Sequence, residues 1–505
     1  MHRSKILGGL ALASLMLVAL TGCPSFIANI VGASESVQQA IDQASSGDTI
    51  KVQGSHDENV TVDKDNVTIT GDNGASIDGN VTVDGNNVKI SNVTITGTLD
   101  TVPGSFENLT LSNVTVEAWG DATVSGTFTC DTILQPGEGS IQSLVDNASA
   151  GDDLCVAKDS YSESVTIAGK PNLTLHGMGT PTIEGTGGST NAAIAVNDAD
   201  GTTIRGFSIT NPSGRFGIWI GNFGSNPSSD VTIGNNTIED VGQSYPADHE
   251  IVGILVDSDS NNATIQNNTI QNIVDSDSNS EGRATGISLV GRSAPVTGAQ
   301  IRNNTIQSIS AAPADTENNK ARAIEFSTCV EEAQVENNQI TNIGSATTDY
   351  AQGITITESD GVPCSSGTVG PTNFKITGNT IKNLMAGGDY KGAPRQAALF
   401  IGGYSTLGDN HKVQQNNILD GAVDRCCGDM AESLLTVNNW WGDASGPSTV
   451  DDTGASPGDS AKIDADEYVE DPKTGELADN SGSPIVKRHN ASADVRFDDW
   501  AKSPF

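Results

Sequence analysis

Apolar and polar residues alternate in short runs along almost the whole chain, and the runs recur in a fixed order. Between Asn59 and Val116 the period is 21 residues, so that NVTVDKDNVTI at position 59 returns as NVTVDGNNVKI at position 80. Each run alternates Val, Ile, Leu or Thr with polar residues and ends at Gly, Asn or Asp, which is the pattern of a short strand with one apolar face. The sequence therefore predicts many short strands joined by tight turns.

The same unit continues, with longer insertions, to about residue 442. One turn position is Gly or Asn in eleven of twelve repeats, and these two residue types adopt a left-handed backbone at the least cost. The twelve positions are Gly71, Asn92, Asn113, Gly177, Gly206, Asn235, Asn267, Asn303, Asn337, Gly378, Gln415 and Asn439. Because a single coil cannot bury its own apolar face, repeats of 21 to 41 residues predict a stacked solenoid.

This pattern resembles the right-handed parallel β-helix of the pectin-lyase-like superfamily over residues 35–445. The resemblance implies an all-β solenoid whose coils stack about 4.8 Å apart and turn with a right hand. It does not extend to the chemistry of that superfamily. The sequence shows neither the paired Asp residues and Gly-His-Gly of polygalacturonases nor the Gln-rich signature of pectin methylesterases.

The segment SIQSLVDNASAGDDLCV, which begins at Ser140, nearly repeats SVQQAIDQASSGDTIKV, which begins at Ser36. Each copy places apolar residues on one stripe of a short helix and follows it with a Gly-Asp turn into a strand. Since an open solenoid end exposes its core, we interpret each helix as a lid on a separate module. We expect a short module over 35–132, a main module over 133–442, and an acidic irregular segment over 443–505 that docks on the solenoid or caps it.

Residues 1–22 have the form of a signal peptide, with basic MHRSK followed by an apolar run too short for a comfortable membrane span. The LTGC that follows resembles the lipobox of exported lipoproteins, which implies that Cys23 becomes the lipid-bearing N-terminus. Residues 23–34 are then a tether. We therefore expect an exported protein that is held by lipid on the outer face of the membrane or cell envelope.

The chain has 63 acidic against 26 basic residues, a formal net charge of −37, and only 4% aromatic residues. A surface of this sign repels nucleic acid, which is excluded as a partner. An acidic, Lys-poor surface resembles that of proteins from halophilic microbes.

The chain has seven cysteines, and six remain when the lipid-bearing Cys23 is set aside. An even number suits disulfides in an exported protein. Cys329 and Cys364 follow the same strand in consecutive coils, and Cys130 and Cys155 bracket the second lid, so we predict both pairs. The sequence assigns no partner to the adjacent Cys426 and Cys427.

One strand in each coil of the main module reads Gly-Ile-x-Val or a close variant. Its second and fourth positions point inward, and its third position points outward. The third positions form a row, which consists of Trp219, Leu255, Ser288, Glu325, Thr355 and Phe400. The row either forms an open trough for an extended sugar chain, with Trp219 and Phe400 as stacking surfaces, or lies beneath its own loops.

Glu325 is the candidate for acid–base chemistry, because Arg322 precedes it by three residues, Asp257 lies two coils away and Arg283 lies on the strand between. The same pairing of Glu with Arg is also ordinary for a surface ion pair. Two functions follow. One is a surface protein that binds a polysaccharide or envelope glycan, or serves as an adhesin or spacer. The alternative is a polysaccharide lyase or glycoside hydrolase, which the missing superfamily motifs disfavour.

Two acidic loops carry oxygen ligands at alternate positions, DSDSNN with Asp257 and Asp259, and DSDSNS with Asp275 and Asp277. Such spacing suits Ca²⁺, although neither loop has the Gly and Glu of an EF-hand. The loops are either Ca²⁺ sites or solvated acidic turns. No other cofactor is expected.

Overall fold

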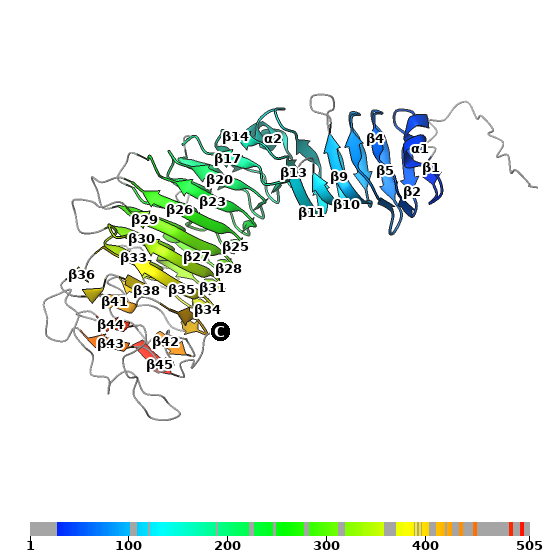
Figure 1. Ribbon diagram of the computed structural model, residues 1–505. Coiled ribbons are helices and arrows are strands. Elements are labelled where there is room, and N and C mark those ends of the chain that lie inside the picture. The colour runs from blue at the N-terminus through cyan, green and yellow to red at the C-terminus, as the bar shows by residue number, and fades with distance from the viewer. Residues whose placement is uncertain are drawn as a thin grey trace, which may run out of the picture.

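A computed structural model describes the chain over residues 28–101, 109–119, 122–187, 190–221, 227–245, 249–276, 282–311, 319–357, 370–387, 389–390, 393–394, 396–402, 411–419, 422–426, 434–437, 448–451, 484–487 and 495–498. The fold is an all-β, right-handed parallel β-helix in two tandem modules, each of which begins with a short helix (Figure 1). The fold class predicted from the sequence is confirmed.

The short module is built from eleven strands that join in one sheet. Its strands pair in parallel, except that β11 returns antiparallel along β10. The strands are β1 (Ala28–Val31), β2 (Thr49–Val52), β3 (Ser55–His56), β4 (Val60–Val62), β5 (Thr68–Gly71), β6 (Ser76–Ile77), β7 (Val81–Val83), β8 (Lys89–Ser91), β9 (Thr94–Thr101), β10 (Thr110–Trp119) and β11 (Ala122–Cys130).

The main module has three parallel sheets, and each coil from β13 to β41 contributes one strand to each. The first sheet comprises β12 (Thr132–Leu134), β13 (Asp153–Val156), β16 (Thr174–Gly177), β19 (Thr203–Arg205), β22 (Thr232–Gly234), β25 (Thr264–Gln266), β28 (Gln300–Arg302), β31 (Gln334–Glu336), β34 (Lys375–Thr377), β39 (Lys412–Gln414), β42 (Leu434–Val437) and β45 (Val495–Asp498). The second sheet comprises β14 (Ser160–Tyr161), β17 (Thr182–Glu184), β20 (Ser208–Asn211), β23 (Thr237–Val241), β26 (Thr269–Asp275), β29 (Thr305–Ala311), β32 (Gln339–Gly344), β35 (Thr380–Met385) and β40 (Asn417–Ile418).

The third sheet carries the strands in which the sequence places the outward row. It comprises β15 (Val165–Ala168), β18 (Ala192–Asn197), β21 (Phe216–Ile220), β24 (Ile251–Asp257), β27 (Arg283–Thr297), β30 (Lys320–Glu331), β33 (Tyr350–Thr357), β38 (Gln396–Gly402), β41 (Ala422–Cys426), β44 (Pro484–Lys487) and β43 (Ser448–Asp451). Strands β36 (Asp389–Tyr390) and β37 (Ala393–Pro394) form a separate antiparallel pair. The described parts of 443–505 are thus strands that extend the first and third sheets.

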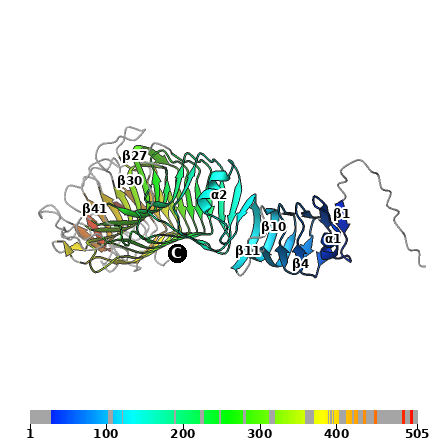
Figure 2. The ribbon, with the colours of Figure 1, turned by 90° about the horizontal axis from the view of Figure 1, so that it is seen from above.

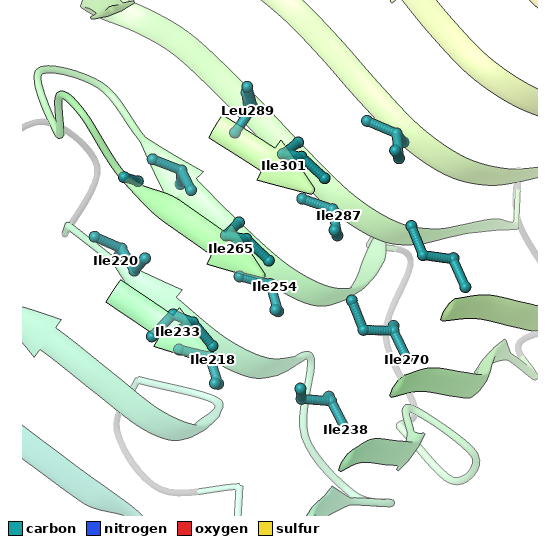
Figure 3. Close-up of a cluster of buried hydrophobic side chains, with 14 of the residues drawn as sticks. Ile218, Ile220, Ile233, Ile238, Ile254, Ile265, Ile270, Ile287, Leu289 and Ile301 are labelled. Atoms are coloured by element: carbon teal, nitrogen blue, oxygen red, sulfur yellow. The ribbon is translucent and has the colours of Figure 1, made fainter. Parts of the chain in front are cut away.

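The core is a stack of β-branched side chains in strict register (Figure 3). Ile218, Ile254 and Ile287 are paired positions on successive strands of the third sheet. Ile233, Ile265 and Ile301 form the matching column on the first sheet. Each buried side chain of this size contributes about 1.5–3 kcal/mol, so the columns supply the main attraction between coils.

A ladder of buried asparagines joins the first and second sheets at their shared turn. Asn304 shows the pattern: its backbone N–H and its Nδ2 both donate to Oδ1 of Asn338, at 2.9 and 3.0 Å, and Nδ2 also donates to the carbonyl of Ile265 at 2.8 Å. The amide ladder consists of Asn236, Asn268, Asn304, Asn338, Asn379 and Asn416. Each buried amide therefore satisfies the backbone of its own turn and of the neighbouring coil.

The turn residue before each ladder asparagine has a left-handed backbone, as the Gly/Asn pattern predicts. The φ angles of Asn235, Asn303 and Gln415 are 55°, 55° and 56°. Gln415, which is neither Gly nor Asn, therefore has the same left-handed backbone as the others. Gly71 and Gly177 differ, because their φ angles are not positive. A Cβ at Gly71 would instead collide with the carbonyl oxygen of Asn92 in the next coil, which explains the glycine there. Asn439 lies outside the described residues.

Helices α1 (Val37–Gln43) and α2 (Ile141–Asn147) lie at the start of the two modules (Figure 2). Each is capped at its N-terminus by a serine, Ser36 or Ser140, whose hydroxyl accepts a backbone N–H of the first turn. The buried residues of α2 are Ile141 and Val145. Both helices therefore bury one apolar stripe on the solenoid end, as expected for lids.

In both lids, a glutamate carboxylate accepts hydrogen bonds from the first backbone N–H groups of the helix. Glu58 accepts the N–H groups of Val37 and Gln38 at 2.6 and 3.3 Å, and Glu163 accepts those of Ile141 and Gln142 at 2.7 and 3.0 Å. Burial alone would raise the pKa of the Glu58 carboxyl, but the hydrogen bonds that it accepts hold its pKa below the ordinary value. The negative carboxylate is also favoured by the positive end of the helix dipole.

The two modules meet at an apolar junction with a disulfide at its centre. Cys130 on β11 is bonded to Cys155 on β13, as the sequence predicts, and the two Cα atoms are 5.6 Å apart. Cys155, Ala157 and Met178 of the main module are buried in the core of the short module. The equivalent positions of the short module are Lys51, Gln53 and Asp72, where Nζ of Lys51 lies 2.8 Å from the Asp72 carboxylate. These positions are therefore apolar in the main module, where they face the short module, and polar at the equivalent places in the short module.

Cys329 is disulfide-bonded, and its predicted partner Cys364 lies outside the described residues. The predicted signal peptide and Cys23 also lie outside them. The later part of the predicted tether is not a free linker, because Ala28–Val31 forms β1 and pairs in parallel with β2. Among the residues described here, no helix combines the length and the apolarity needed to cross a membrane.

The amide ladder predicts a large, position-specific loss of stability on truncation. Asn304→Ala removes the side-chain donor of the Asn338 amide oxygen, the donor of the Ile265 carbonyl and the acceptor that serves the Asn268 N–H groups at 2.9 and 3.1 Å. We expect the free energy of unfolding to fall by about 3 kcal/mol, because buried polar groups lose their partners. Guanidinium unfolding followed by circular dichroism measures this loss.

The matched control is Asn303→Gly, the preceding residue of the same turn. Asn303 is exposed and left-handed, and glycine adopts that conformation without strain. Its effect should stay within about 1 kcal/mol. Equal losses in the two variants would show that the turn, and not the buried amide, supplies the stability.

Candidate functional site

The predicted outward row is in register across six strands of the third sheet. Trp219 pairs with Leu255, Leu255 with Ser288, Ser288 with Glu325, Glu325 with Thr355, and Thr355 with Phe400. A second row runs beside it and contains Phe216, Val252, Thr285, Arg322, Gln352 and Ala397. We call the surface formed by these two rows the outward face.

The N-terminal part of the outward face is apolar and covered. Trp219 is only 3% exposed and lies against Phe216, with ring centroids 5.1 Å apart. The two rings belong to a buried cluster outside the main core, together with Ala192, Ala195, Val252, Leu255 and Val290. The sequence left open whether Trp219 lines an open trough or lies beneath other residues. The structure shows that it lies beneath other residues. Phe400, at the other end of the row, is partly exposed.

The centre of the outward face holds a charged group formed by Glu250, Arg322 and Glu325, which we call the carboxylate–guanidinium group. Nη1 of Arg322 lies 2.6 Å from Oε1 of Glu325 and 3.8 Å from Oε1 of Glu250. The exposed fractions of the side chains are 15% for Glu250, 8% for Arg322 and 5% for Glu325. Two carboxyl groups thus share one guanidinium where little water reaches them.

The hydrogen bonds around the two carboxyl groups are unequal. Glu325 accepts from Arg322 and, at 3.3 and 3.4 Å, from the hydroxyls of Thr357 and Ser288. Glu250 accepts one hydroxyl, that of Thr285 at 2.7 Å. More donors stabilise the ionised form of Glu325, so the proton that the pair retains resides on Glu250.

The pKa values follow this inequality. Burial and the adjacent charge of Glu325 raise the pKa of Glu250 to about 7, against the opposing effects of Arg322 and Thr285. Burial also acts to raise the pKa of Glu325, but the charge of Arg322 and the hydrogen bonds from Glu250, Arg322 and Thr357 hold it below the ordinary value. The group therefore keeps one carboxylate ionised and carries a second carboxyl that titrates near neutral pH.

The basic residues of this region lie mostly on the third sheet, in an otherwise acidic chain. Between residues 206 and 330, five of the six Lys and Arg residues lie on strands of the third sheet or directly before one; these are Arg215, Arg283, Arg292, Lys320 and Arg322. Nε of Arg215 donates to the backbone carbonyl of Glu250 at 2.8 Å, and its guanidinium lies 4.8 Å from the centre of the Phe216 ring. Burial lowers the pKa of Arg215, and the nearby charge of Glu250 opposes that shift.

The structure brings together only part of the predicted site. Arg322 and Glu325 are in contact as predicted. Asp257 is buried one row further along, in register with Val290, and its carboxylate accepts the N–H of Ser258. Arg283 lies at the beginning of β27, in register with Lys320 and two residues before Thr285. The candidate catalytic set of Glu325, Asp257, Arg322 and Arg283 is therefore spread along four rows.

Sequence reasoning missed Glu250 because it lies in the insertion before β24 and outside the repeated strand. Insertions differ in length from coil to coil, so the repeat assigns no register to a residue within them. The only available signal was a Glu placed immediately before a Gly-Ile-x-Val strand, which is too common to be specific.

The predicted Ca²⁺ ligands do not converge in the described part of the chain. Asp257 and Asp275 end strands of different sheets, and the carboxylate of Asp275 accepts the backbone N–H of Arg283 at 2.8 Å. Asp259 has a left-handed backbone with φ of 63°, and Asp277 lies outside the described residues. Among the residues that the structure describes, no three acidic, His or Cys side chains are grouped so as to hold a metal ion.

The chain is similar in structure to several β-helix proteins. An alginate lyase from a Paenibacillus species shares 15% identity and a TM-score of 0.35, over 58% of this chain and 94% of that one. The A-module of an Azotobacter vinelandii mannuronan C-5 epimerase shares 16% identity and a TM-score of 0.31, over 74% and 93%. A tailspike protein of an E. coli bacteriophage shares 12% identity and a TM-score of 0.36, over 74% and 54%.

No family model matches the sequence, and no curated protein matches it. At these identities and TM-scores, the similarities concern the fold alone and add no argument about function.

The raised pKa of Glu250 predicts a specific pH dependence of stability. The folded state holds this proton up to about pH 7, whereas the unfolded chain releases it near pH 4.3. The contribution is therefore complete below about pH 4.3 and is lost as pH rises toward 7. We expect Glu250→Gln to remove this loss, so that its stability relative to the native sequence rises by about 2 kcal/mol between pH 5 and pH 8.

Denaturant unfolding at constant ionic strength and several pH values measures the effect. Glu184→Gln is the control. Glu184 is exposed on β17 of the second sheet, and its substitution removes the same formal charge. The assignment would be contradicted if Glu250→Gln and Glu184→Gln changed the pH slope equally.

Proposed function

We propose that the protein binds an extended acidic polysaccharide along the outward face of the third sheet. The observation that carries the proposal is that five of the six basic residues between 206 and 330 lie on strands of the third sheet or directly before one, in a chain whose net charge is −37. An anion is repelled by most of such a surface, so a local cationic patch determines where an anionic chain can bind.

The burial of the carboxylate–guanidinium group supports a functional role over a purely structural one. Removing charges from water costs several kcal/mol per ion, and an ion pair seldom recovers more than this cost. Apolar side chains of similar size, such as those of the neighbouring buried cluster, would stabilise the sheet at least as well. Perturbed ionisable groups of this kind are concentrated at functional sites.

The proposal includes export, with lipid on Cys23 as the anchor and an envelope or extracellular glycan as the ligand. The disulfides support it, since Cys130–Cys155 and the bond of Cys329 are stable in an oxidising compartment. The signal peptide and the lipobox-like LTGC of the sequence point in the same direction. The large excess of carboxylates agrees with a halophilic source.

A second candidate function is cleavage of the bound polysaccharide. The observation that favours it is the unequal protonation of Glu250 and Glu325, because an ionised base beside a protonated acid can move a proton onto a leaving oxygen. In a β-elimination, the base takes a proton from the carbon next to the uronate carboxyl and the acid protonates the departing glycosidic oxygen. The products are then a shortened chain and an unsaturated uronate end.

Binding is tested by replacing one cation on the outward face. Lys320→Gln should weaken binding of polygalacturonate by about three- to tenfold, because one charge-assisted contact is lost. Lys382→Gln is the matched control, since Lys382 is exposed on β35 of the second sheet and carries the same charge. Isothermal titration calorimetry with dextran as a neutral comparison measures both. Equal weakening by the two variants would place the ligand elsewhere.

Cleavage is tested by the release of unsaturated uronate or new reducing ends from polygalacturonate. If the second candidate holds, Glu325→Gln should lower the release rate by at least about 100-fold, the usual scale for loss of an acid or base. Glu239→Gln, a substitution on β23 of the second sheet, controls for the charge change. The absence of any release by the native sequence, together with measurable binding, would eliminate cleavage and leave binding.

A further inference from the structure

The carboxylate–guanidinium group has a charge that depends on a single proton. Arg322 carries one positive charge, and Glu325 and Glu250 carry one negative charge each when ionised. With a proton on Glu250 the group is neutral overall. Without that proton its net charge is −1, at the centre of the surface to which an anionic ligand would bind.

The position of that proton follows from the contacts of the two carboxyl groups. Glu325 receives the guanidinium at 2.6 Å and two hydroxyls, whereas Glu250 receives only the Thr285 hydroxyl. Since both carboxyl groups are mostly buried and face one guanidinium, ionising both places two like charges close together with little solvent to screen them. Glu250, which accepts fewer hydrogen bonds than Glu325, is therefore the group that gains and loses the proton.

Each element packed against Glu250 supplies a known set of charged or titratable groups. Strand β30 supplies Arg322 and Glu325, and β27 supplies Thr285 and also Arg292, whose charge acts on Arg215. Arg215 contacts the Glu250 backbone from the residue before β21, and Tyr245 and His249 precede Glu250 in its own segment. His249 is the imidazole that lies directly before Glu250 in the chain, so it requires a control.

We propose that the outward face binds an anionic polysaccharide together with a proton on Glu250, so that ligand affinity falls as this carboxyl ionises. This inference rests on the proposed binding function, and it adds that protonation regulates ligand affinity at the same site. A ligand carboxylate near Arg322 favours the neutral group and therefore favours proton uptake by Glu250. By linkage, the same proton raises the affinity for the anion. The site would then hold its glycan at mildly acidic pH and release it at alkaline pH.

The test measures binding of polygalacturonate to the full chain from pH 5.5 to pH 8.5 by isothermal titration calorimetry at fixed ionic strength. The carboxyl groups of this probe remain ionised throughout the range, so the ligand does not change. We expect the dissociation constant of the native sequence to rise at least about tenfold between pH 6 and pH 8.5. Calorimetry in buffers of different ionisation enthalpy should show uptake of up to about one proton per site near pH 7.5.

Three variants make the assignment specific. Glu250→Gln should bind with an affinity that does not vary with pH and without proton uptake. His249→Gln should retain the pH dependence of the native sequence. Thr285→Val, which removes the hydroxyl that donates to Glu250 and keeps the side-chain volume, should move the midpoint to higher pH. This third variant tests the proposal even if Glu250→Gln does not fold.

The outcomes separate the inference from the proposed function. Binding that is independent of pH in the native sequence, or a pH dependence that survives in Glu250→Gln, overturns the inference and leaves the binding function intact. Loss of the pH dependence in His249→Gln assigns the proton to that residue and also overturns the inference. Failure of polygalacturonate to bind at any pH overturns both.

Discussion

The hydrogen bonding of the buried turn between the first and second sheets is the constraint on which the rest of the structure depends. From Asn235 to Gln415 each coil turns there through one left-handed residue, and the asparagine that follows places its amide where the backbone of two coils would otherwise lack partners. Unsatisfied buried amides cost about 1–3 kcal/mol each, so each of these coils is held in one register by its neighbour. The register in turn aligns the isoleucine columns inside and the two outward rows of the third sheet.

The candidate site is a product of this alignment. Residues far apart in the sequence become neighbours because successive strands place equivalent positions side by side, as with Thr285, Arg322 and Gln352. A solenoid can therefore exchange side chains on its outer face without disturbing the columns within. Buried charge is tolerated at the centre of that face because Gln352, Thr355, Thr357 and Ser288 supply hydrogen bonds around it.

Features that follow from a strict period were predictable from the sequence. The outward row from Trp219 to Phe400 was placed correctly because side chains alternate along every strand, and the disulfide of Cys130 followed from the duplicated lid. Glu250 was not predictable, since an insertion of variable length fixes no register. The burial of Trp219 was left open for a related reason: its exposure depends on what lies over the sheet, and the strand pattern does not report that.

The disulfide at the junction determines how the molecule responds to mechanical force. It connects β11 directly to β13 across 25 residues, and α2 lies within the bridged loop. Tension along the chain therefore passes through the sulfur atoms and cannot peel α2 away from the main module. Helix α1 has no equivalent protection, because the sequence contains no cysteine between Cys23 and Cys130. Under load the short module would unravel first and extend, while the three sheets of the main module beyond the bridge would stay folded.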